Sequence, residues 1–526
     1  MSASQRPARH MKELEAKFLI SAGKRPTRVL RRVLQELSWA GYLTHPRGTR
    51  EIADVYSDSA DWHLHKAGWT YRVRHSKGRQ TVTLKQLSHQ RSNIFERREL
   101  EQLLPPGEDD HALPPGEVAE LLASTLPKGT PLCVLFEQRT ARRRYNLSHP
   151  NHPHALIELS LDQVLVQSSP PTNYAEIEFE LRDGPPEALK DLAGVMEQQP
   201  DLVPARVGKY QRGLLAAGLS VPESGVWQAA PKDVYAKWVE VAISHLSLQR
   251  ARLKQHEPSA WEAVHPEGVH QMRVTTRRIR AGLAAFANVL PQKSAARLKD
   301  DVRWLTSALG PVRDLDVQLE NLHNYRHLLT TAQGPALNRY QRHLEQRHRK
   351  AHRALVCELA SDRIATLDAH FERVLEKASR RASQQRGISI QQAASDQVLP
   401  LLESVLKRGR AIKKSSPAEK LHKLRIELKR LRYQLEYLID SCGKPARRSH
   451  KELSRLQNVL GSYQDAMVAM EQLEHYCHHT NLDRVERRTF NELMAWERER
   501  GERYRRKFPK RWARFENVAG SLLQVL

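Results

Sequence analysis

Cysteine is scarce in this chain. The 526 residues include four, Cys133, Cys357, Cys442 and Cys477, which lie far apart and form no Cys-x-x-Cys pair. This spacing suggests neither a disulfide framework nor a thiolate metal site, so we predict free thiols in a reducing compartment.

Long uncharged apolar runs are missing as well. No stretch of membrane-spanning length lacks charge, and the first residues, "MSASQRPARH", have no apolar core of the kind that a secretory signal contains. We therefore expect a cytoplasmic protein with no membrane partner.

Acidic residues are outnumbered by basic ones. The chain holds 85 Lys and Arg against 60 Asp and Glu, a formal charge of +25. The excess is uneven, because residues 1–230 hold 30 basic and 27 acidic side chains whereas residues 231–526 hold 55 and 33. Such an excess predicts a polyanionic partner for the second half, with nucleic acid, a phosphate polymer and an anionic membrane as the candidates.

The pattern of residues divides the chain into two structural classes. Up to about residue 215, short β-rich runs alternate with turn signals, which predicts antiparallel hairpins closing into a barrel, with one helix in "TRVLRRVLQELSWAG" and another in "PGEVAELLASTL". The stretch "PPGEDDHALPPGE" is expected to be an exposed loop. Long helical segments follow. We predict an α+β protein: a barrel domain at 10–215, a linker at 216–231 and a helical domain at 232–526.

The helical half contains an internal repeat. "VHQMRVTTRRIRAGLAAF" matches "LHKLRIELKRLRYQLEYL" without a gap, and "VRWLTSALGPVRDLDV" matches "LSRLQNVLGSYQDAMV". In each leading helix a basic stripe runs beside the apolar stripe, which favours anion binding over an ordinary solvated face. The predicted anion-binding residues are His270, Arg273, Arg277, Arg280, His422, Arg425, Lys429 and Arg432.

The second blocks of the repeat carry a glycine followed four residues later by an aspartate. Gly310 precedes Asp314, and Gly461 precedes Asp465. The glycines fit either a helix end or close packing, and the aspartates fit either capping or the orientation of basic side chains.

Charged residues alternate with apolar ones along the predicted strands. In "ELEAK", Glu13, Glu15 and Lys17 share one face of the strand. One such strand is typical of a solvated edge, but six with interleaved charges favour a polar barrel interior. Carboxylates there suit a hard divalent cation such as Mg²⁺, and Lys and Arg suit phosphate oxygens, which predicts a metal–triphosphate site.

These strands resemble a known family. "ELEAK" matches the Glu-x-Glu-x-Lys signature of the CYTH superfamily, the triphosphate tunnel metalloenzymes, and "YRVRHSKGRQTVTLKQ", "IELSLD" and "EIEFEL" resemble its later tunnel strands. "VGKYQRG" resembles its terminal lysine motif. The duplicated half is similar to the CHAD domain, named for recurring histidines that His270 and His422 match. Together the halves resemble bacterial CYTH–CHAD proteins, which include inorganic triphosphatases.

The resemblance implies roles for individual residues. The metal, Mg²⁺ or Mn²⁺, would be held by Glu13, Glu15, Glu176 and Glu178. The triphosphate would be bound by Lys17, Arg72, Arg74, Lys85, Arg142 and Lys209, with Arg139 as an alternative to Arg142. The catalytic candidates are Glu158, Asp162 and Glu180. Glu158 and Asp162 would belong to the metal shell or place the attacking water, and Glu180 would be either a base that orients this water or a structural residue.

The implied function is metal-dependent hydrolysis of inorganic triphosphate by a metal-associated water, with a helical domain that binds inorganic polyphosphate. The alternatives are a thiamine or nucleoside triphosphatase, and a binding protein that docks on polyphosphate granules and whose tunnel is inactive or secondary. Nucleic acid is not expected as a partner, because Tyr433 and Tyr437 are the only aromatics near the basic stripe and fit a helical core.

Overall fold

The structure is a computed structural model that describes residues 9–21, 23–87, 93–104, 116–168, 171–219, 237–262, 264–383, 387–413 and 415–523. The predicted acidic loop and most of the predicted linker lie outside these ranges, as does the side chain of Cys442. Cys133, Cys357 and Cys477 are free thiols. The chain forms two compact units, Met1–Gly225 with Glu257–Gly268, and Val226–His256 with Val269–Leu526.

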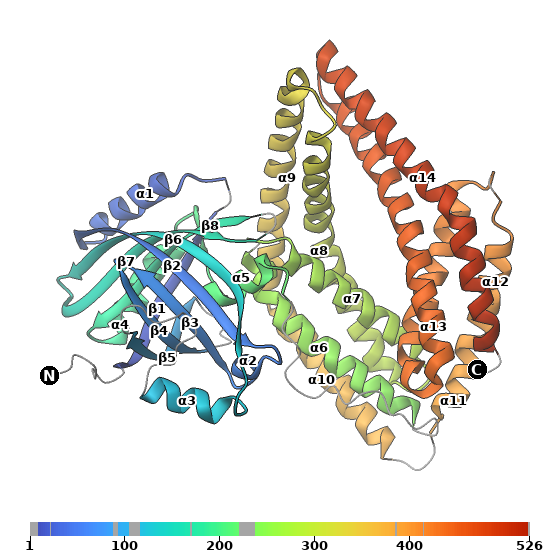
Figure 1. Cartoon of the computed structure of the whole chain (residues 1–526), viewed down its shortest axis with the longest axis horizontal. Coiled ribbons are helices and arrows are strands. Elements are labelled where there is room, and N and C mark those ends of the chain that lie inside the picture. Colours follow the sequence, from blue (N-terminus) through green and yellow to red (C-terminus); the bar gives the residue numbers. More distant parts are fainter. Residues whose placement is uncertain are drawn as a thin grey trace. The chain divides into compact units, whose positions relative to one another are not determined.

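The first unit contains nine strands and the helices that cover them (Figure 1). The strands are β1 (Arg9–Ile20), β2 (Leu43–Ser59), β3 (Trp69–Ser76), β4 (Arg79–Gln86), β5 (Ile94–Leu103), β6 (Leu132–His149), β7 (His152–Val166), β8 (Thr172–Asp183) and β9 (Leu202–Pro204). The helices are α1 (Pro26–Trp39), α2 (His63–Lys66), α3 (Glu117–Thr125), α4 (Pro186–Glu197) and α5 (Lys209–Ala216).

The strands form one antiparallel sheet that closes on itself. Their order is β5-β4-β3-β2-β6-β7-β8-β1-β9, and β5 pairs again with β1, so that β1 to β8 complete a barrel. Closure removes the open edges and gives every strand one inward and one outward face. The predicted N-terminal antiparallel barrel is confirmed.

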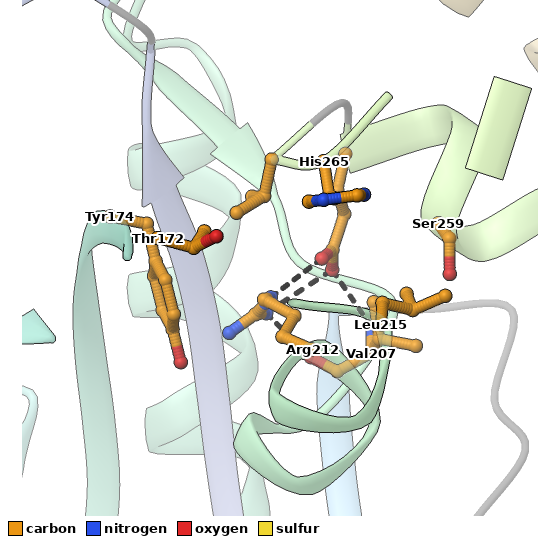
Figure 2. Close-up of a pocket in the computed structure, with 9 residues that line it drawn as sticks. Thr172, Tyr174, Val207, Arg212, Leu215, Ser259 and His265 are labelled. Atoms are coloured by element: carbon orange, nitrogen blue, oxygen red, sulfur yellow. Dashed lines mark hydrogen bonds and ion pairs between the residues drawn. The ribbon is translucent and has the colours of Figure 1, made fainter. Parts of the chain in front are cut away.

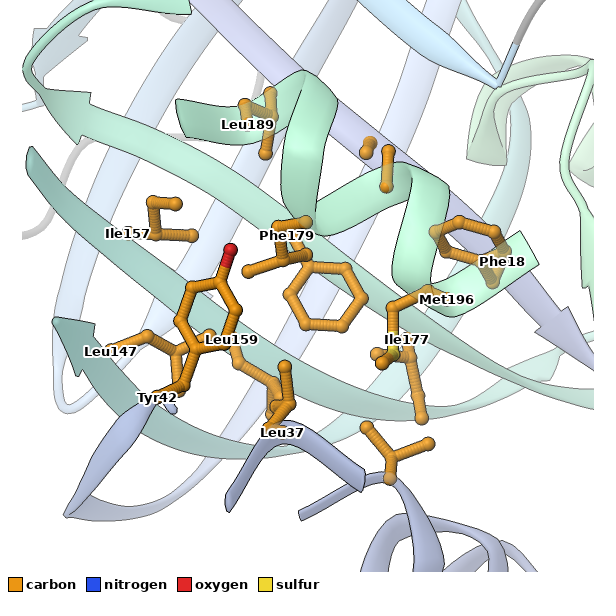
Figure 3. Close-up of a cluster of buried hydrophobic side chains, with 14 of the residues drawn as sticks. Phe18, Leu37, Tyr42, Leu147, Ile157, Leu159, Ile177, Phe179, Leu189 and Met196 are labelled. Atoms are coloured by element: carbon orange, nitrogen blue, oxygen red, sulfur yellow. The ribbon is translucent and has the colours of Figure 1, made fainter. Parts of the chain in front are cut away.

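The apolar core of this unit lies outside the barrel wall. Phe18 of β1 and Phe179 of β8 point outward and pack against Leu37 of α1 and Leu189 of α4 (Figure 3). The predicted helix in "TRVLRRVLQELSWAG" is α1, and Gly41 after it has a φ of 89°, a left-handed conformation suited to a helix stop. Because the helices bury the outward faces, the inward faces are left for the polar residues of the same strands.

A second apolar cluster covers β3, β4 and β5. Outward side chains of these strands, including Tyr71 and Val82, pack with Leu64 of α2 and with Val118 and Leu122 of α3. Much of the barrel wall is therefore buried on the outside by short helices.

The remaining elements are helical. They are α6 (Trp238–Glu262), α7 (Glu267–Ala285), α8 (Gln292–Arg326), η1 (Thr331–Gln333), α9 (Gly334–Ala360), α10 (Asp362–Ala382), α11 (Ile390–Ala393), η2 (Ala394–Val398), α12 (Leu399–Arg410), α13 (Ala418–His479) and α14 (Arg484–Leu523). Within the described residues, none of these helices has the length and apolar character needed to cross a membrane.

The repeat maps onto α7 and α8 in the first copy and onto α13 in the second. In α13 the two repeat blocks are joined through Gly443, whose non-helical φ of 62° kinks the helix. Gly310 and Gly461 both lie within helices, so neither glycine is a helix end. A side-chain carbon at Gly310 would lie 2.8 Å from Arg273, which makes close packing the reason for that glycine.

Candidate functional site

The inner face of the barrel is lined by charged side chains. The side chains of Glu13, Glu15 and Lys17 on β1 point inward and are 8%, 2% and 4% exposed. Ala16 and Phe18, at the alternate positions, face the outer core. The alternation seen in the sequence therefore separates a charged interior from an apolar exterior. This answers for β1 the choice between a solvated edge strand and a tunnel strand.

Three carboxylates converge deep in this interior. Asp162 of β7 is paired in register with Glu176 of β8, and Glu178 follows on the same face. Their oxygens lie within 4.8 Å of one another, and among the described residues they form the group whose spacing would suit a metal ion. Hard divalent cations such as Mg²⁺ and Mn²⁺ prefer oxygen ligands of this kind, so the donor set fits the implied metal.

Basic side chains surround the three carboxylates. Lys209 Nζ lies 2.8 Å from Asp162, 2.5 Å from Glu176 and 2.7 Å from Glu178. The Arg142 guanidinium donates two hydrogen bonds to Asp162, at 2.8 and 2.6 Å, and a third to Glu178 at 2.8 Å. Lys17 donates to Glu178 at 2.6 Å. Each of these buried acids is thus paired with a base, which offsets the free-energy cost of burying its charge.

The electrostatic consequence is clearest at Glu178. Burial by itself raises the pKa of this carboxyl, but Lys17, Lys209 and Arg142 together bring its pKa well below the usual range. The pKa of Lys209 is raised well above its usual value, because Asp162, Glu176 and Glu178 outweigh the effect of burial. Glu178 and Lys209 therefore remain charged at neutral pH.

A second group of acids lies next to it along β1 and β8. Glu15 is paired in register with Glu180, and Lys85 of β4 forms ion pairs with Glu13 and, at 3.7 Å, with Glu15. Burial and the neighbouring Glu13 raise the pKa of Glu180 to about 8, although Arg182 at 2.6 Å opposes this. Glu180 is therefore mostly protonated at neutral pH, and a cation bound beside it would favour its ionised form.

Strand β3 contributes two further cations. Arg74 makes two hydrogen bonds to Asp54 of β2, at 2.7 and 3.0 Å. Arg72 lies 3.8 Å from Asp54 and 3.5 Å from Glu99, and donates to Thr83 at 3.1 Å. Both arginines are thus held by acids within the same wall.

Helix α5 carries Lys209 into the barrel. The helix packs on inward-facing apolar residues at one end of the interior, with Tyr210 against Tyr56 and Phe136. Helix α5 approaches strand β6 closely, since a Cβ at Gly213 would lie 2.0 Å from the Phe136 ring. Packing of α5 therefore decides where the Lys209 ammonium lies.

The structure separates the predicted site residues into groups. The interior residues are Glu13, Glu15, Lys17, Arg72, Arg74, Lys85, Arg142, Glu158, Asp162, Glu176, Glu178, Glu180 and Lys209. Glu158 stands apart from the metal group, because Arg144 at 3.2 Å and Arg182 at 3.0 Å bind it. Arg139 is exposed on the outer face of β6, so it is wrong as an alternative to Arg142.

Two positions that contact the predicted site residues escaped the sequence prediction. Asp54, 1% exposed, binds Arg74 and lies 3.8 Å from Arg72, and it lies on β2, a segment that the sequence analysis did not identify as a strand. Arg212 stood inside the recognised "VGKYQRG" stretch, and it donates to Glu176 at 2.5 Å.

The second unit brings the two basic stripes of the repeat together. Arg277 is exposed at its surface, but partial desolvation lowers its pKa, and Arg273 of the same helix and Arg425 and Arg432 of α13 lower it further. Burial likewise lowers the pKa of Lys429 to about 8, with Arg425, Arg277 and Arg432 adding to the effect. These cations from α7 and α13 are close enough to repel one another.

The other residues of the stripes and the two aspartates are placed as follows. His422 contacts Gln464 at 3.2 Å, and Arg280 is exposed on α7. Asp314 lies 3.6 Å from Arg273. Burial raises the pKa of Asp465, while Arg425, Arg500 and Lys429 lower it. Both aspartates lie within helices, so neither caps a helix end.

Known protein families match both halves of the chain. A family model for the CYTH domain matches residues 11–213, and one for the CHAD domain matches residues 244–474. An uncharacterized protein of Mycobacterium tuberculosis is 28% identical over 210 residues, which are 39% of this chain and 40% of that protein. The chain thus aligns with less than half the length of that relative.

Two solved structures are similar to separate parts of the chain. The CHAD domain from the plant Ricinus communis is 25% identical and covers 53% of this chain and 93% of its own, with a TM-score of 0.45. A protein from Hippeastrum, described as having a dominant triphosphatase activity, is 16% identical and covers 40% of this chain and 98% of its own, with a TM-score of 0.29.

Proposed function

Because the chain consists of a CYTH domain followed by a CHAD domain, we propose that its barrel hydrolyses inorganic triphosphate with the aid of Mg²⁺ or Mn²⁺. The observation that carries the proposal is the buried group of Asp162, Glu176 and Glu178 inside a closed barrel, in contact with Lys209 and Arg142. Acids for a metal and cations for phosphate oxygens thus meet in one enclosed space.

The metal would be held by Glu176 and Glu178 together with Asp162. Bound there, it would withdraw electron density from phosphoryl oxygens and acidify a water molecule. Glu13 and Glu15 lie beside this group along β1 and supply further negative charge. The neighbouring Lys17, Lys209 and Arg142 lower the pKa of Glu178 and so keep this carboxylate ionised for a divalent cation.

A bound triphosphate would replace the carboxylates as the binding partner of the basic side chains. Lys17, Arg142 and Lys209 point at the carboxylate group, and Arg72, Arg74 and Lys85 line the adjoining wall. Their positive charge offsets the charge that develops on the equatorial and leaving oxygens during phosphoryl transfer. No side-chain nucleophile is required for this reaction. Water placed by Glu158, Asp162 or Glu180 remains the predicted nucleophile.

Inorganic triphosphate is favoured over thiamine or nucleoside triphosphates by the lining of the tunnel. At one end the inward residues are Tyr56, Phe136, Val164 and Val166, and these are occupied in packing against α5. The charged part of the interior is therefore bounded by an apolar plug, which leaves those aromatics no free ring face to stack on a base.

Phosphate release from inorganic triphosphate with Mg²⁺ or Mn²⁺ tests the proposal. We expect metal-dependent turnover by the full chain and its loss in Glu13→Ala/Glu15→Ala. Arg139→Ala, on the outer face, is the matched control and should keep normal activity. Absence of release from several triphosphates would contradict the hydrolase and favour a binding protein with an inactive tunnel.

The helical unit is proposed to bind inorganic polyphosphate, and through it polyphosphate granules. The supporting observation is that cations of α7 and α13 lie close enough to lower one another's pKa values. A polyanion would relieve this repulsion. Binding of a polyphosphate chain should weaken in Arg425→Ala/Lys429→Ala, while Arg430→Ala, exposed on the same helix but outside the stripe, should bind normally. Equal binding by all three proteins would contradict this assignment.

A further inference from the structure

Glu262 is a buried acid of the first unit that lies outside the segment matched by the CYTH family. Its side chain is 1% exposed. One oxygen accepts hydrogen bonds from the backbone N–H groups of Arg206 and Val207, at 2.6 and 2.8 Å. The guanidinium of Arg212 donates to the same carboxylate, through Nε at 2.7 Å and Nη2 at 3.2 Å. Four donors therefore converge on one carboxylate.

The bonded chain continues from Glu262 into the tunnel. Arg212 also donates through Nη1 to Glu176 at 2.5 Å and through Nη2 to the carbonyl of Val207 at 2.5 Å. Figure 2 shows Arg212 beside Val207 among the residues that line a pocket, with dashed lines marking the hydrogen bonds and ion pairs between the residues drawn. Glu176 in turn contacts the Lys209 ammonium. Glu262 is thus linked to the metal-binding group through a single arginine.

We propose that Glu262 is a positioning residue of the tunnel, which aligns Arg212 and the backbone before Lys209 so that Glu176 keeps the charge and orientation needed to hold a divalent metal. The proposal rests on the function proposed above and deepens it. It places part of the catalytic apparatus in residues 257–268, beyond the CYTH match at 11–213.

The physical reason is the division of one positive charge between two acids. With Glu262 ionised, Arg212 shares its charge between Glu262 and Glu176, and Glu176 retains negative charge for a cation. With Glu262 neutral, the guanidinium is left to neutralise Glu176 alone. Outer contacts of this type set metal affinity, and their removal commonly weakens binding about 10-fold or more.

The test is a titration of the full-length protein with Mn²⁺ alone, in which free Mn²⁺ is followed by electron paramagnetic resonance. Glu262→Gln is expected to weaken Mn²⁺ binding roughly 10-fold. In the activity assay the metal concentration for half-maximal rate should rise by a similar factor, with a smaller change in KM for triphosphate. Glu257→Gln is the matched control, because Glu257 is an acid of the same helix that forms an ion pair with the side chain of Arg206, at 3.2 Å.

Unchanged Mn²⁺ binding by Glu262→Gln would overturn the proposal, even if thermal stability fell, because a purely structural role would lower stability alone. If Glu262→Gln is not recovered folded, Arg212→Lys gives the same test. A lysine has a single ammonium nitrogen, so it lacks the separate guanidinium nitrogens that bind Glu176 and Glu262 at the same time. Failure of the wild type to hydrolyse any triphosphate would contradict the proposed function, while the Mn²⁺ titration would still decide the role of Glu262.

Discussion

Lys17 Nζ lies 2.6 Å from Glu178 Oε1, and the two side chains face each other across the register pair of β1 and β8. Both are more than nine-tenths buried, so neither charge is stabilised by bulk water. Burying such a pair costs desolvation energy that the pair must recover through mutual contact. The charged interior is therefore stable only while its acids and bases neutralise one another, and a ligand must replace both partners together.

Metal and triphosphate are consequently expected to bind cooperatively. A metal that takes Glu178 releases Lys17 for a phosphate oxygen, and a phosphate that takes Lys17 releases Glu178 for the metal. We expect Mg²⁺ to tighten binding of a non-hydrolysable triphosphate analogue by roughly 10- to 100-fold, within the usual range of coupling energies. Isothermal titration with and without Mg²⁺ measures this. Equal affinity in the two titrations would contradict the exchange of partners.

Glu178→Gln should impair both stability and activity. The substitution leaves Lys17, Lys209 and Arg142 with one acid fewer in a buried site, and breaking a buried pair in this way costs about 3–5 kcal/mol. Urea unfolding should show a loss approaching this size, and phosphate release should fall to background. Arg139→Ala, on the outer face of the barrel, should leave both measurements near wild type. Normal turnover by Glu178→Gln would exclude this residue from the metal site.

The interior of the barrel was predictable where strand alternation is unambiguous. Glu13, Glu15 and Lys17 alternate strictly with apolar residues, and the structure buries them as that pattern indicates. Around Arg142 the pattern is ambiguous because Arg143 and Arg144 follow directly, so the sequence left Arg139 open, and only the pairing of Arg142 with Asp162 decides the face.

Contacts made by distant segments were not predictable. Glu262 lies on a helix, and nothing in its local sequence indicates that it binds Arg212, because that contact depends on tertiary structure. The same holds for Gly213, whose role appears only once Phe136 is seen against α5. In the helical half, α8 continues through Gly310 and Pro311 although both residues have low helix propensity, because tertiary packing overrides that local preference.

Gly213→Ala should displace helix α5. The added methyl group would lie 2.0 Å from the Phe136 ring, so either the ring or the helix must move, and overpacking of this type costs about 1–3 kcal/mol. Because Lys209 starts α5, its ammonium should shift with the helix, and phosphate release should fall along with stability.

The control for this substitution is Gly194→Ala in α4. Nothing lies within 4 Å of the added carbon there, and alanine is favoured over glycine in helices by about 1 kcal/mol. Thermal unfolding should therefore show Gly194→Ala to be at least as stable as wild type. Equal stability of the two variants would mean that α5 does not depend on close contact with Phe136.

Polyphosphate binding by the helical unit should weaken as the pH rises through 8. Burial and the neighbouring Arg425, Arg277 and Arg432 lower the pKa of Lys429 to about 8, so this ammonium is charged below that pH and neutral above it. The folded protein holds this proton less tightly than the unfolded chain does, so the same deprotonation relieves repulsion and raises stability between about pH 8 and the ordinary pKa of lysine, about 10.4.

A polyanion prefers the charged form of Lys429, so affinity and stability should move in opposite directions over this interval. From about pH 7 to about pH 9 the dissociation constant for polyphosphate should increase roughly 10-fold, as expected when one required proton is lost. Lys429→Arg keeps its charge at both values and should flatten the profile. Fluorescence anisotropy with labelled polyphosphate measures both proteins, and a slope that survives in Lys429→Arg would assign the pH dependence to another group.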